Sequence, residues 1–338
     1  MRIQTLVAFG ISMAFAGMAP LTAQTQWGVT KTFHIGGEGG WDYVTVDPPN
    51  HRFFVTRSTH TQAIDEETGK VLADIPGQVR SHGVALAPKL GRGFITDGGG
   101  GGAILVFDLN SYQVLGKIAT MPDSDGIIYD PSTNLVLAVS GDGGALMTFR
   151  PEIDLKSGKI DEPIKLDGAP EFLAVDGRGK AFINLEDKDV VAVVDLHTRK
   201  VVSRWHIAPG GHPVGMAIDA KARRLFIGCR NPQKMIVMST EDGKVEAALP
   251  IGAGVDAAQV FGHESFASSR DGSLTVIGEK AGKFEVEQTV KTTDGARTMG
   301  LDADTRKIFL PTAEMTTGAN GRPTAKPGTF EIIVVGQP

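Results

Sequence analysis

The chain has 338 residues, of which 41% are hydrophobic and 22% are charged, and its formal net charge is −5 at pH 7. This acidic balance disfavours broad binding to nucleic acid, because affinity for a phosphate backbone comes mainly from Lys and Arg side chains that displace counterions. Cys229 is the only cysteine, which excludes an intramolecular disulfide.

The first residues have the pattern of an export signal. Arg2 supplies a positive start, residues 6–16 form a short apolar core, and Leu21-Thr22-Ala23 places small residues before a cleavage point. The apolar run is shorter than the roughly 20 residues that a membrane-spanning helix needs. We therefore expect a signal peptide over residues 1–23, no transmembrane span, and a periplasmic or secreted mature chain, 24–338.

The rest of the chain repeats one pattern of short apolar strands, in which the first turn usually opens with Asp. The equivalent turn positions are spaced by 40, 43, 46, 43, 43 and 40 residues, a period typical of four-stranded propeller blades. These positions are Asp47, Ala87, Asp130, Asp176, Asp219, Gly262 and Asp302. The sequence therefore predicts an all-β fold: a single-domain, seven-bladed β-propeller of four-stranded antiparallel blades.

The strands themselves are short and rich in β-branched and aromatic residues, as in residues 52–56 and 135–139, which indicates burial on both faces. Fourth strands are predicted after turns at residues 68–70, 157–159 and 242–244, where Gly allows a tight hairpin. The last repeat ends with its third strand, residues 330–335. We expect the N-terminal segment, residues 29–35, to complete the seventh blade and close the ring.

Several motifs resemble those of the YVTN-repeat, YncE-like seven-bladed propeller family, over nearly the whole mature chain. They are Val44-Thr45-Val46-Asp47-Pro48, residues 68–71, residues 82–88, residues 243–245 and residues 254–257. The resemblance implies an exported bacterial protein and does not imply a particular reaction. Two repeats depart from the pattern: Phe149-Arg150-Pro151 replaces a strand-ending Asp in the third, and the sixth lacks the turn Asp.

Propeller geometry predicts one face on which ionisable residues gather. The inner strand of each blade begins at one rim of the central channel, and the second strand returns to that rim. The first set of rim positions is Asp42, His82, Asp125, Glu171, Val214, Asp256 and Arg297. The second set is Arg57, Asp97, Asp142, Glu186, Arg230, Arg270 and Glu314.

From these sets we select a candidate ligand-binding group. Crowding should raise the pKa of some of its carboxylates and lower the pKa of others beside Arg57 or Arg297, as often happens in binding sites. The alternative is that these side chains cap strand ends, bridge blades or are simply solvated. The selected residues are Asp42, His82, Asp125, Glu171, Asp256, Arg297, Arg57 and Glu186.

Three functions are compatible with such a rim. The first is a monomeric binding or interaction module for a small molecule, peptide or partner protein. The second is a propeller enzyme of the lyase, lactonase or quinoprotein kind that uses rim carboxylates and His82. The third is single-stranded nucleic-acid binding, with bases stacked on Trp41, Phe172 and Trp205. The sequence identifies no catalytic residue and no cofactor.

Other conspicuous residues have structural interpretations. The rim acids and His82 would suit a cation, but they come from separate blades without a local ligand spacing, so we assign no metal ligand. The turn aspartates are expected to cap their own turns. Cys229 is expected to be a small buried apolar side chain. His206 and His212 flank a Pro-Gly-Gly loop that could reach the rim.

Overall fold

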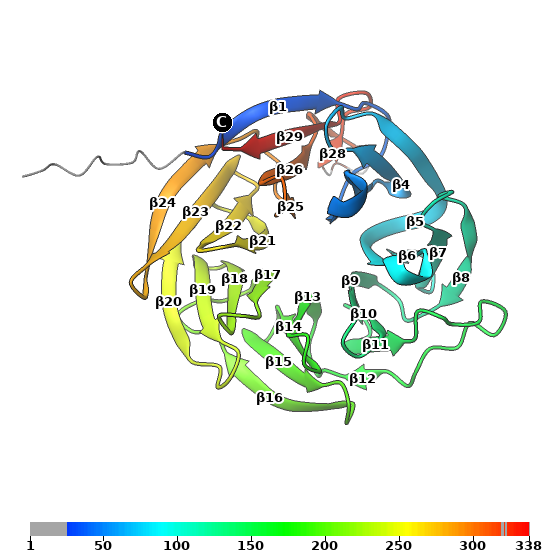
Figure 1. Cartoon of the computed structure of the whole chain (residues 1–338), viewed down its shortest axis with the longest axis horizontal. Coiled ribbons are helices and arrows are strands. Elements are labelled where there is room, and N and C mark those ends of the chain that lie inside the picture. The colour runs from blue at the N-terminus through cyan, green and yellow to red at the C-terminus, as the bar shows by residue number, and fades with distance from the viewer. Residues whose placement is uncertain (1–25, 319–320, 322, 338) are drawn as a thin grey trace, which may run out of the picture.

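The computed structural model describes residues 26–318, 321 and 323–337, so the expected signal peptide lies outside the described residues. The strands are antiparallel within each sheet and form blades around a central axis (Figure 1). Two 3₁₀ turns, η1 (Pro48–Asn50) and η2 (Pro88–Leu90), follow the inner strands of the first two blades. No helix in the described part of the chain is long and apolar enough to cross a membrane.

The first three blades follow chain order from the inside outward. A 17-residue strand, β5, belongs to two of them, because it pairs with β4 up to Ser81 and with β6 from Ser81 onward. Blade 1 contains β2 (Val44–Asp47), β3 (Arg52–Thr56), β4 (Ser58–Asp65) and the first half of β5 (Val71–Ala87). Blade 2 contains the second half of β5, β6 (Arg92–Asp97), β7 (Ala103–Asp108) and β8 (Val114–Ala119). Blade 3 contains β9 (Ser124–Asp130), β10 (Leu135–Ser140), β11 (Ala145–Phe149) and β12 (Ile164–Lys165).

The next three blades each have four complete strands. Blade 4 contains β13 (Pro170–Val175), β14 (Lys180–Leu185), β15 (Val190–Asp195) and β16 (Lys200–His206). Blade 5 contains β17 (Pro213–Asp219), β18 (Arg224–Arg230), β19 (Gln233–Ser239) and β20 (Val245–Pro250). Blade 6 contains β21 (Val255–Phe261), β22 (Glu264–Ser269), β23 (Ser273–Lys280) and β24 (Lys283–Lys291).

The seventh blade combines both ends of the described chain, as predicted. Its inner strands are β25 (Gly300–Asp302) and β26 (Lys307–Thr312), followed by β29 (Glu331–Gly336). The outermost strand is β1 (Gly28–His34), which pairs antiparallel with β29. Because the first strand of the fold completes the last blade, the ring is closed by main-chain hydrogen bonds.

The hydrophobic core consists of seven clusters, counted over the described residues, and each cluster joins two adjacent blades. One of them brings Phe309 and Phe330 of blade 7 against Phe53 and Val55 of blade 1. A four-stranded sheet cannot bury both faces alone, and radial packing removes both from water. The uninterrupted circle of clusters accounts for the strands with no exposed residues, such as β10.

Glycine turns bring neighbouring blades together. The predicted hairpins at Gly69 and Gly243 have positive φ angles of 70° and 73°. A Cβ atom at either glycine would lie within 2.3 Å of an aromatic ring, that of Phe33 or Trp205 respectively. Glycine is therefore required there both for the backbone angle and for close packing against the preceding blade.

The two departures from the repeat pattern have different outcomes. In blade 3, β11 ends at Phe149 and residues 150–163 form a loop, so the fourth strand is reduced to the two residues of β12. The fourth strand predicted after residues 157–159 is therefore present as β12, and it is short. In blade 6, Gly262 takes the left-handed conformation, with φ 61°, and replaces the usual turn Asp.

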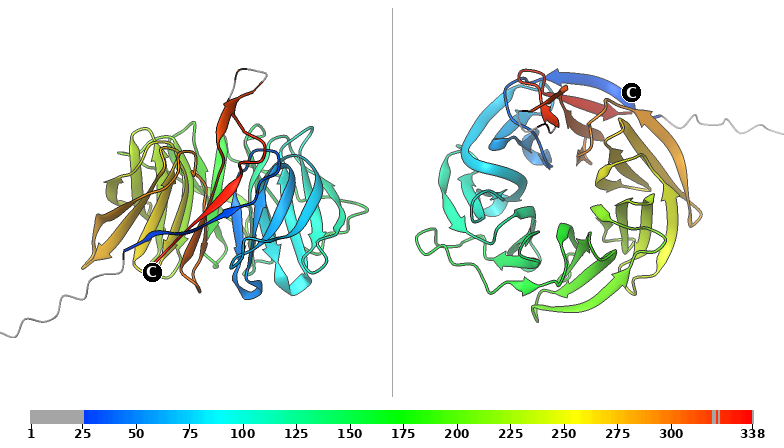
Figure 2. Two further views of the ribbon diagram at one scale, coloured as in Figure 1. Left: turned by 90° about the horizontal axis from the view of Figure 1, so that it is seen from above. Right: turned by 180° about the vertical axis from the view of Figure 1, so that it is seen from behind.

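The turn aspartates have the structural role predicted for them. Asp130, for example, accepts hydrogen bonds from the Ser132 amide and from the hydroxyls of Ser132 and Thr133. These turns lie at the end of the inner strands, on the face away from the rim positions. On the rim face, the hairpin of β27 (Met315–Thr317) and β28 (Pro323–Ala325) follows β26 and stands out from the disc (Figure 2).

Candidate functional site

Hydrogen bonds between adjacent blades fix the backbone at the predicted rim positions. The Thr56 hydroxyl donates to the His82 carbonyl over 2.7 Å, and the Thr96 hydroxyl donates to the Asp125 carbonyl over 2.6 Å. The Ser268 hydroxyl donates to the Arg297 carbonyl in the same way. A polar side chain near the end of the second strand of one blade thus holds the backbone carbonyl of the next blade's residue in the first set of rim positions.

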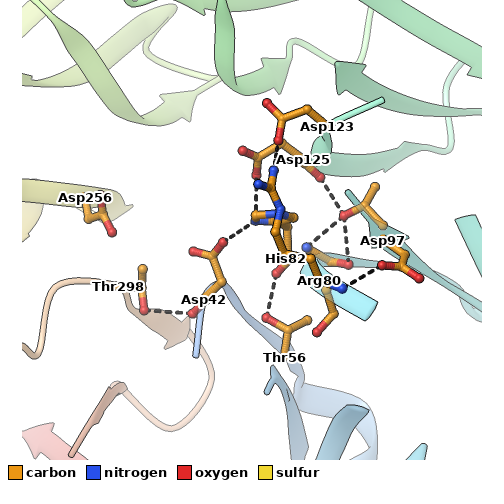
Figure 3. Close-up of polar contacts among 12 residues, drawn as sticks. Asp42, Thr56, Arg80, His82, Asp97, Asp123, Asp125, Asp256 and Thr298 are labelled. Carbon is orange, nitrogen blue, oxygen red and sulfur yellow. Dashed lines mark hydrogen bonds and ion pairs between the residues drawn. The ribbon is translucent and has the colours of Figure 1, made fainter. Parts of the chain in front are cut away.

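Asp42, His82, Asp125 and Glu171 form one side of the channel mouth, which we call the acidic wall. His82 Nδ1 lies 2.6 Å from Asp42 Oδ2 and 3.5 Å from Asp125 Oδ1 (Figure 3). One ligand atom each of Asp42, His82 and Asp125 lies within 4.8 Å of the other two. These three side chains could therefore hold a divalent cation once the contact between His82 and Asp42 is broken. The structure thus brings together side chains from blades 1, 2 and 3, as predicted.

Burial and like charge keep protons on this wall. Burial raises the pKa of Asp125 well above its usual range, and the charges of Asp42 and Glu171 raise it further. Burial also raises the pKa of Glu171 to about 7, with contributions from Glu186 and Asp256. Near neutral pH the wall therefore contains carboxyl groups that can donate hydrogen bonds as well as carboxylates that accept them.

The His82 ring is enclosed rather than presented to solvent. Nδ1 faces Asp42 and Asp125, while Nε2 is buried and has no hydrogen-bond partner in the described residues. A Cβ atom at Gly98 would lie 3.0 Å from Nε2, so glycine leaves the ring its space. The Arg80 guanidinium also lies against Gly98, and it forms an ion pair with Asp123.

Two aromatic rings from distant blades meet in the channel. Tyr43 of blade 1 and Phe172 of blade 4 have ring centroids 5.1 Å apart. Burial raises the pKa of Tyr43 well above its usual value, and the charges of Asp125, Glu171, Asp42 and Asp256 raise it further. The Tyr43 hydroxyl therefore stays protonated. Further along the inner strands is a cavity of about 330 Å³, lined mainly by apolar residues such as Val84, Ile127 and Leu301.

The other side of the mouth is an arginine cluster: Arg230, Arg270 and Arg297 around Asp256. Arg297 Nε lies 2.6 Å from Asp256 Oδ2, and Arg230 pairs with Asp256 Oδ1. Burial raises the pKa of Asp256, while the two paired arginines act in the opposite direction. Asp256 therefore contributes to the opening together with its arginine partners rather than as an isolated acid.

Arg57 and Glu186 lie differently from the other candidates. The Arg57 side chain is fully buried. Its guanidinium donates hydrogen bonds to the carbonyls of Gly40 and Glu38 and to the Gln62 side chain. The guanidinium carbon lies 3.6 Å from the centroid of the Phe330 ring. Burial lowers its pKa to about 10, so it remains charged at neutral pH. Because its donors are engaged within the protein, we leave Arg57 out of the binding set. Glu186 is partly exposed and lies 3.3 Å from His212.

Sequence reasoning missed the part played by three residues. Arg230 and Arg270 occupy predicted rim positions but were not selected, because nothing in the repeat pattern ranks one second-strand position above another. Tyr43 immediately follows a selected residue, and its contact with Phe172 depends on the diameter of the closed ring.

The stacking residues and the cysteine do not form further sites. Trp41 is buried, and Trp205 lies in the outer strand β16, with its ring 5.8 Å from that of Phe182. The three aromatics named above for base stacking therefore do not form one platform. Cys229 is buried as predicted, and burial raises its pKa to about 12, which disfavours a nucleophilic thiolate.

Comparisons with known proteins agree on the fold. No protein-family model matches the chain, and no curated protein matches its sequence. The chain resembles a solved structure of the WD40 repeats of RRP9, with a TM-score of 0.75 and 12% identity over 92% of this chain and 100% of that one. It also resembles a hydrazine synthase of Kuenenia stuttgartiensis, with a TM-score of 0.69 and 14% identity over 81% and 92%. At these identities the likeness establishes a β-propeller and nothing about activity.

Proposed function

We propose that this β-propeller binds a polar ligand, which is a small molecule, a peptide or a segment of a partner protein, at the mouth of its central channel. The observation that carries the proposal is the convergence of ionisable side chains from all seven blades on one opening: the acidic wall comes from blades 1 to 4 and the arginine cluster from blades 5 to 7. Crowded, partly buried carboxyl groups with raised pKa values lower stability at neutral pH. Such arrangements concentrate at functional sites.

Binding fits the geometry better than catalysis by His82. A general base must present a ring nitrogen to a substrate proton. Here Nδ1 is engaged by Asp42, and Nε2 is buried against Gly98. The ring therefore serves to position Asp42 and Asp125, which border the opening.

The same proposal includes cellular location and family. Residues 1–23 act as a signal peptide, and the mature chain, 24–338, is a monomeric propeller of the YncE-like kind in the periplasm or outside the cell. The motifs that resemble that family support this part. Mass spectrometry of the secreted or periplasmic protein should find an N-terminus at Gln24, and a chain that retains Met1 in the cytoplasm would contradict it.

The test of binding begins with protein recovered from its native compartment. Mass spectrometry identifies small molecules or peptides that copurify, and calorimetry measures their affinity for the wild-type protein. The double variant Asp42→Asn, Asp125→Asn should bind at least tenfold more weakly, because it alters the acidic wall without changing its size. Asp304→Asn, on an exposed turn of the opposite face, is the matched control. Equal affinity of the double variant and the control for every captured ligand would refute the site.

A further inference from the structure

The arginine cluster contains three guanidinium groups and only one carboxylate at their centre. Arg230 and Arg297 each contact one oxygen of Asp256. Among the described residues, no hydrogen bond or ion pair engages the Arg270 guanidinium. Three positive charges against one negative charge leave this side of the mouth with a net positive charge.

The cluster is held in place by contacts that leave donors free. Arg230 Nε donates to the Val255 carbonyl over 3.0 Å, and the Arg297 guanidinium lies over the Trp41 ring at 5.6 Å from its centroid. The side chains of Arg230 and Arg297 are 30% and 22% exposed, so both reach solvent at the mouth. The terminal nitrogens of Arg297 and the whole Arg270 guanidinium remain available to an acceptor.

We propose that Arg230, Arg270 and Arg297 bind an oxyanion of the ligand, a carboxylate or a phosphate group, beside Asp256. This inference rests on the proposed function and specifies the chemistry of its ligand. Guanidinium groups suit such anions because their planar fork of donors matches the spacing of two oxygen atoms. Asp256 orients two of the arginines, and the anion supplies the negative charge that the cluster lacks.

The surroundings favour an anion over a cation on this side. Burial lowers the pKa of Arg270, and repulsion from Arg297 lowers it further, so an anion between them would relieve an existing cost. On the facing wall, the raised pKa values of Asp125 and Glu171 reduce the negative charge near neutral pH.

The experiment uses inorganic phosphate and succinate as probes. Thermal unfolding of the mature wild-type protein is followed at constant ionic strength, with sodium chloride as the reference salt. At least one probe should raise the melting temperature, and calorimetry should give a saturable isotherm. A response to phosphate alone identifies a phosphate-bearing ligand, and a response to succinate alone identifies a carboxylate. No response beyond that to chloride would overturn the proposal.

Two matched variants assign the response to the cluster. Arg270→Gln removes a guanidinium that holds no internal partner, so folding should be unaffected while anion affinity falls at least tenfold. Arg178→Gln, on an exposed turn with only a loose contact to Asp176, should respond as the wild type does. Full anion affinity in Arg270→Gln would overturn the assignment. If Arg270→Gln retains a captured ligand that the double variant of the acidic wall loses, the oxyanion site fails and the proposed function stands.

Discussion

At the scale of single residues, the charge of a rim side chain matters less than what surrounds it. Arg57 and Arg297 both belong to the predicted candidate group, yet Arg57 is enclosed by loop carbonyls and Arg297 borders the opening. The sequence places both at the rim because strand counting gives position along a blade. It does not show which side chain turns inward, since that depends on the glycine-rich loop that wraps Arg57.

Glu171 provides a prediction at this scale. Its pKa is about 7 in the folded protein against a usual 4.5, so the folded state holds the proton more tightly and its stability falls as pH rises through that interval. Glu171→Gln removes this loss. We expect the variant to be more stable than the wild type by about 1–3 kcal/mol at pH 8, with little difference at pH 4.5.

Urea denaturation at the two pH values measures the effect. Glu162→Gln, at an exposed position, should match the wild type at both. If the gain in unfolding free energy of Glu171→Gln over the wild type were no larger at pH 8 than at pH 4.5, the result would contradict a buried Glu171 surrounded by like charges.

At the scale of strands, second strands fasten each blade to the inner strand of the next. Thr96 in β6 donates to the Asp125 carbonyl and accepts a hydrogen bond from the Gly83 amide, and all of these groups are buried or nearly so. The Thr56, Asn184 and Ser268 side chains make the equivalent bridge in other blades. The repeat period predicts the strands, but these bridges are visible only when adjacent blades are packed.

Thr96→Val tests such a bridge with a side chain of the same shape. Leaving a buried carbonyl and a buried amide without their partner should cost about 1–3 kcal/mol in the free energy of unfolding. Thr316→Val, in the exposed strand β27, is the control and should change stability by less than about 0.5 kcal/mol. Chemical denaturation of both variants gives the comparison, and similar small effects would contradict a bridging role.

At the scale of the whole molecule, the closed ring is the feature that the sequence predicted best. The period of the turns indicated the blades, and the missing fourth strand of the last repeat indicated closure by the N-terminus. The pairing of β1 with β29 confirms that closure. The contacts of Trp27, the residue before β1, were not predicted. Its ring packs edge-on against Phe266, and its indole nitrogen donates to Glu264 of blade 6, so Trp27 forms a clasp between β1 and blade 6.

This clasp should contribute to ring stability well beyond its size. Trp27 is 3% exposed, and replacing it with Ala should lower the free energy of unfolding by about 3–5 kcal/mol through lost packing. Trp27→Phe keeps most of the packing and should lose about 1 kcal/mol. Val29→Ala, at a half-exposed position of β1, is the control for that strand. Equal unfolding midpoints for Trp27→Ala and Val29→Ala would show that the clasp does not hold the ring.

The claim on which the functional account depends is that ionisable groups from distant blades share one opening. NMR titration of the Glu171 carboxyl carbon, in the wild type and in Asp256→Asn, tests it most directly. We predict that Glu171 titrates near pH 7 in the wild type and at clearly lower pH in the variant. The variant loses the negative charge of Asp256, and the positive charges of Arg230 and Arg297 are then no longer neutralised by it. A wild-type titration near 4.5, or one that Asp256→Asn leaves unchanged, would contradict the shared opening.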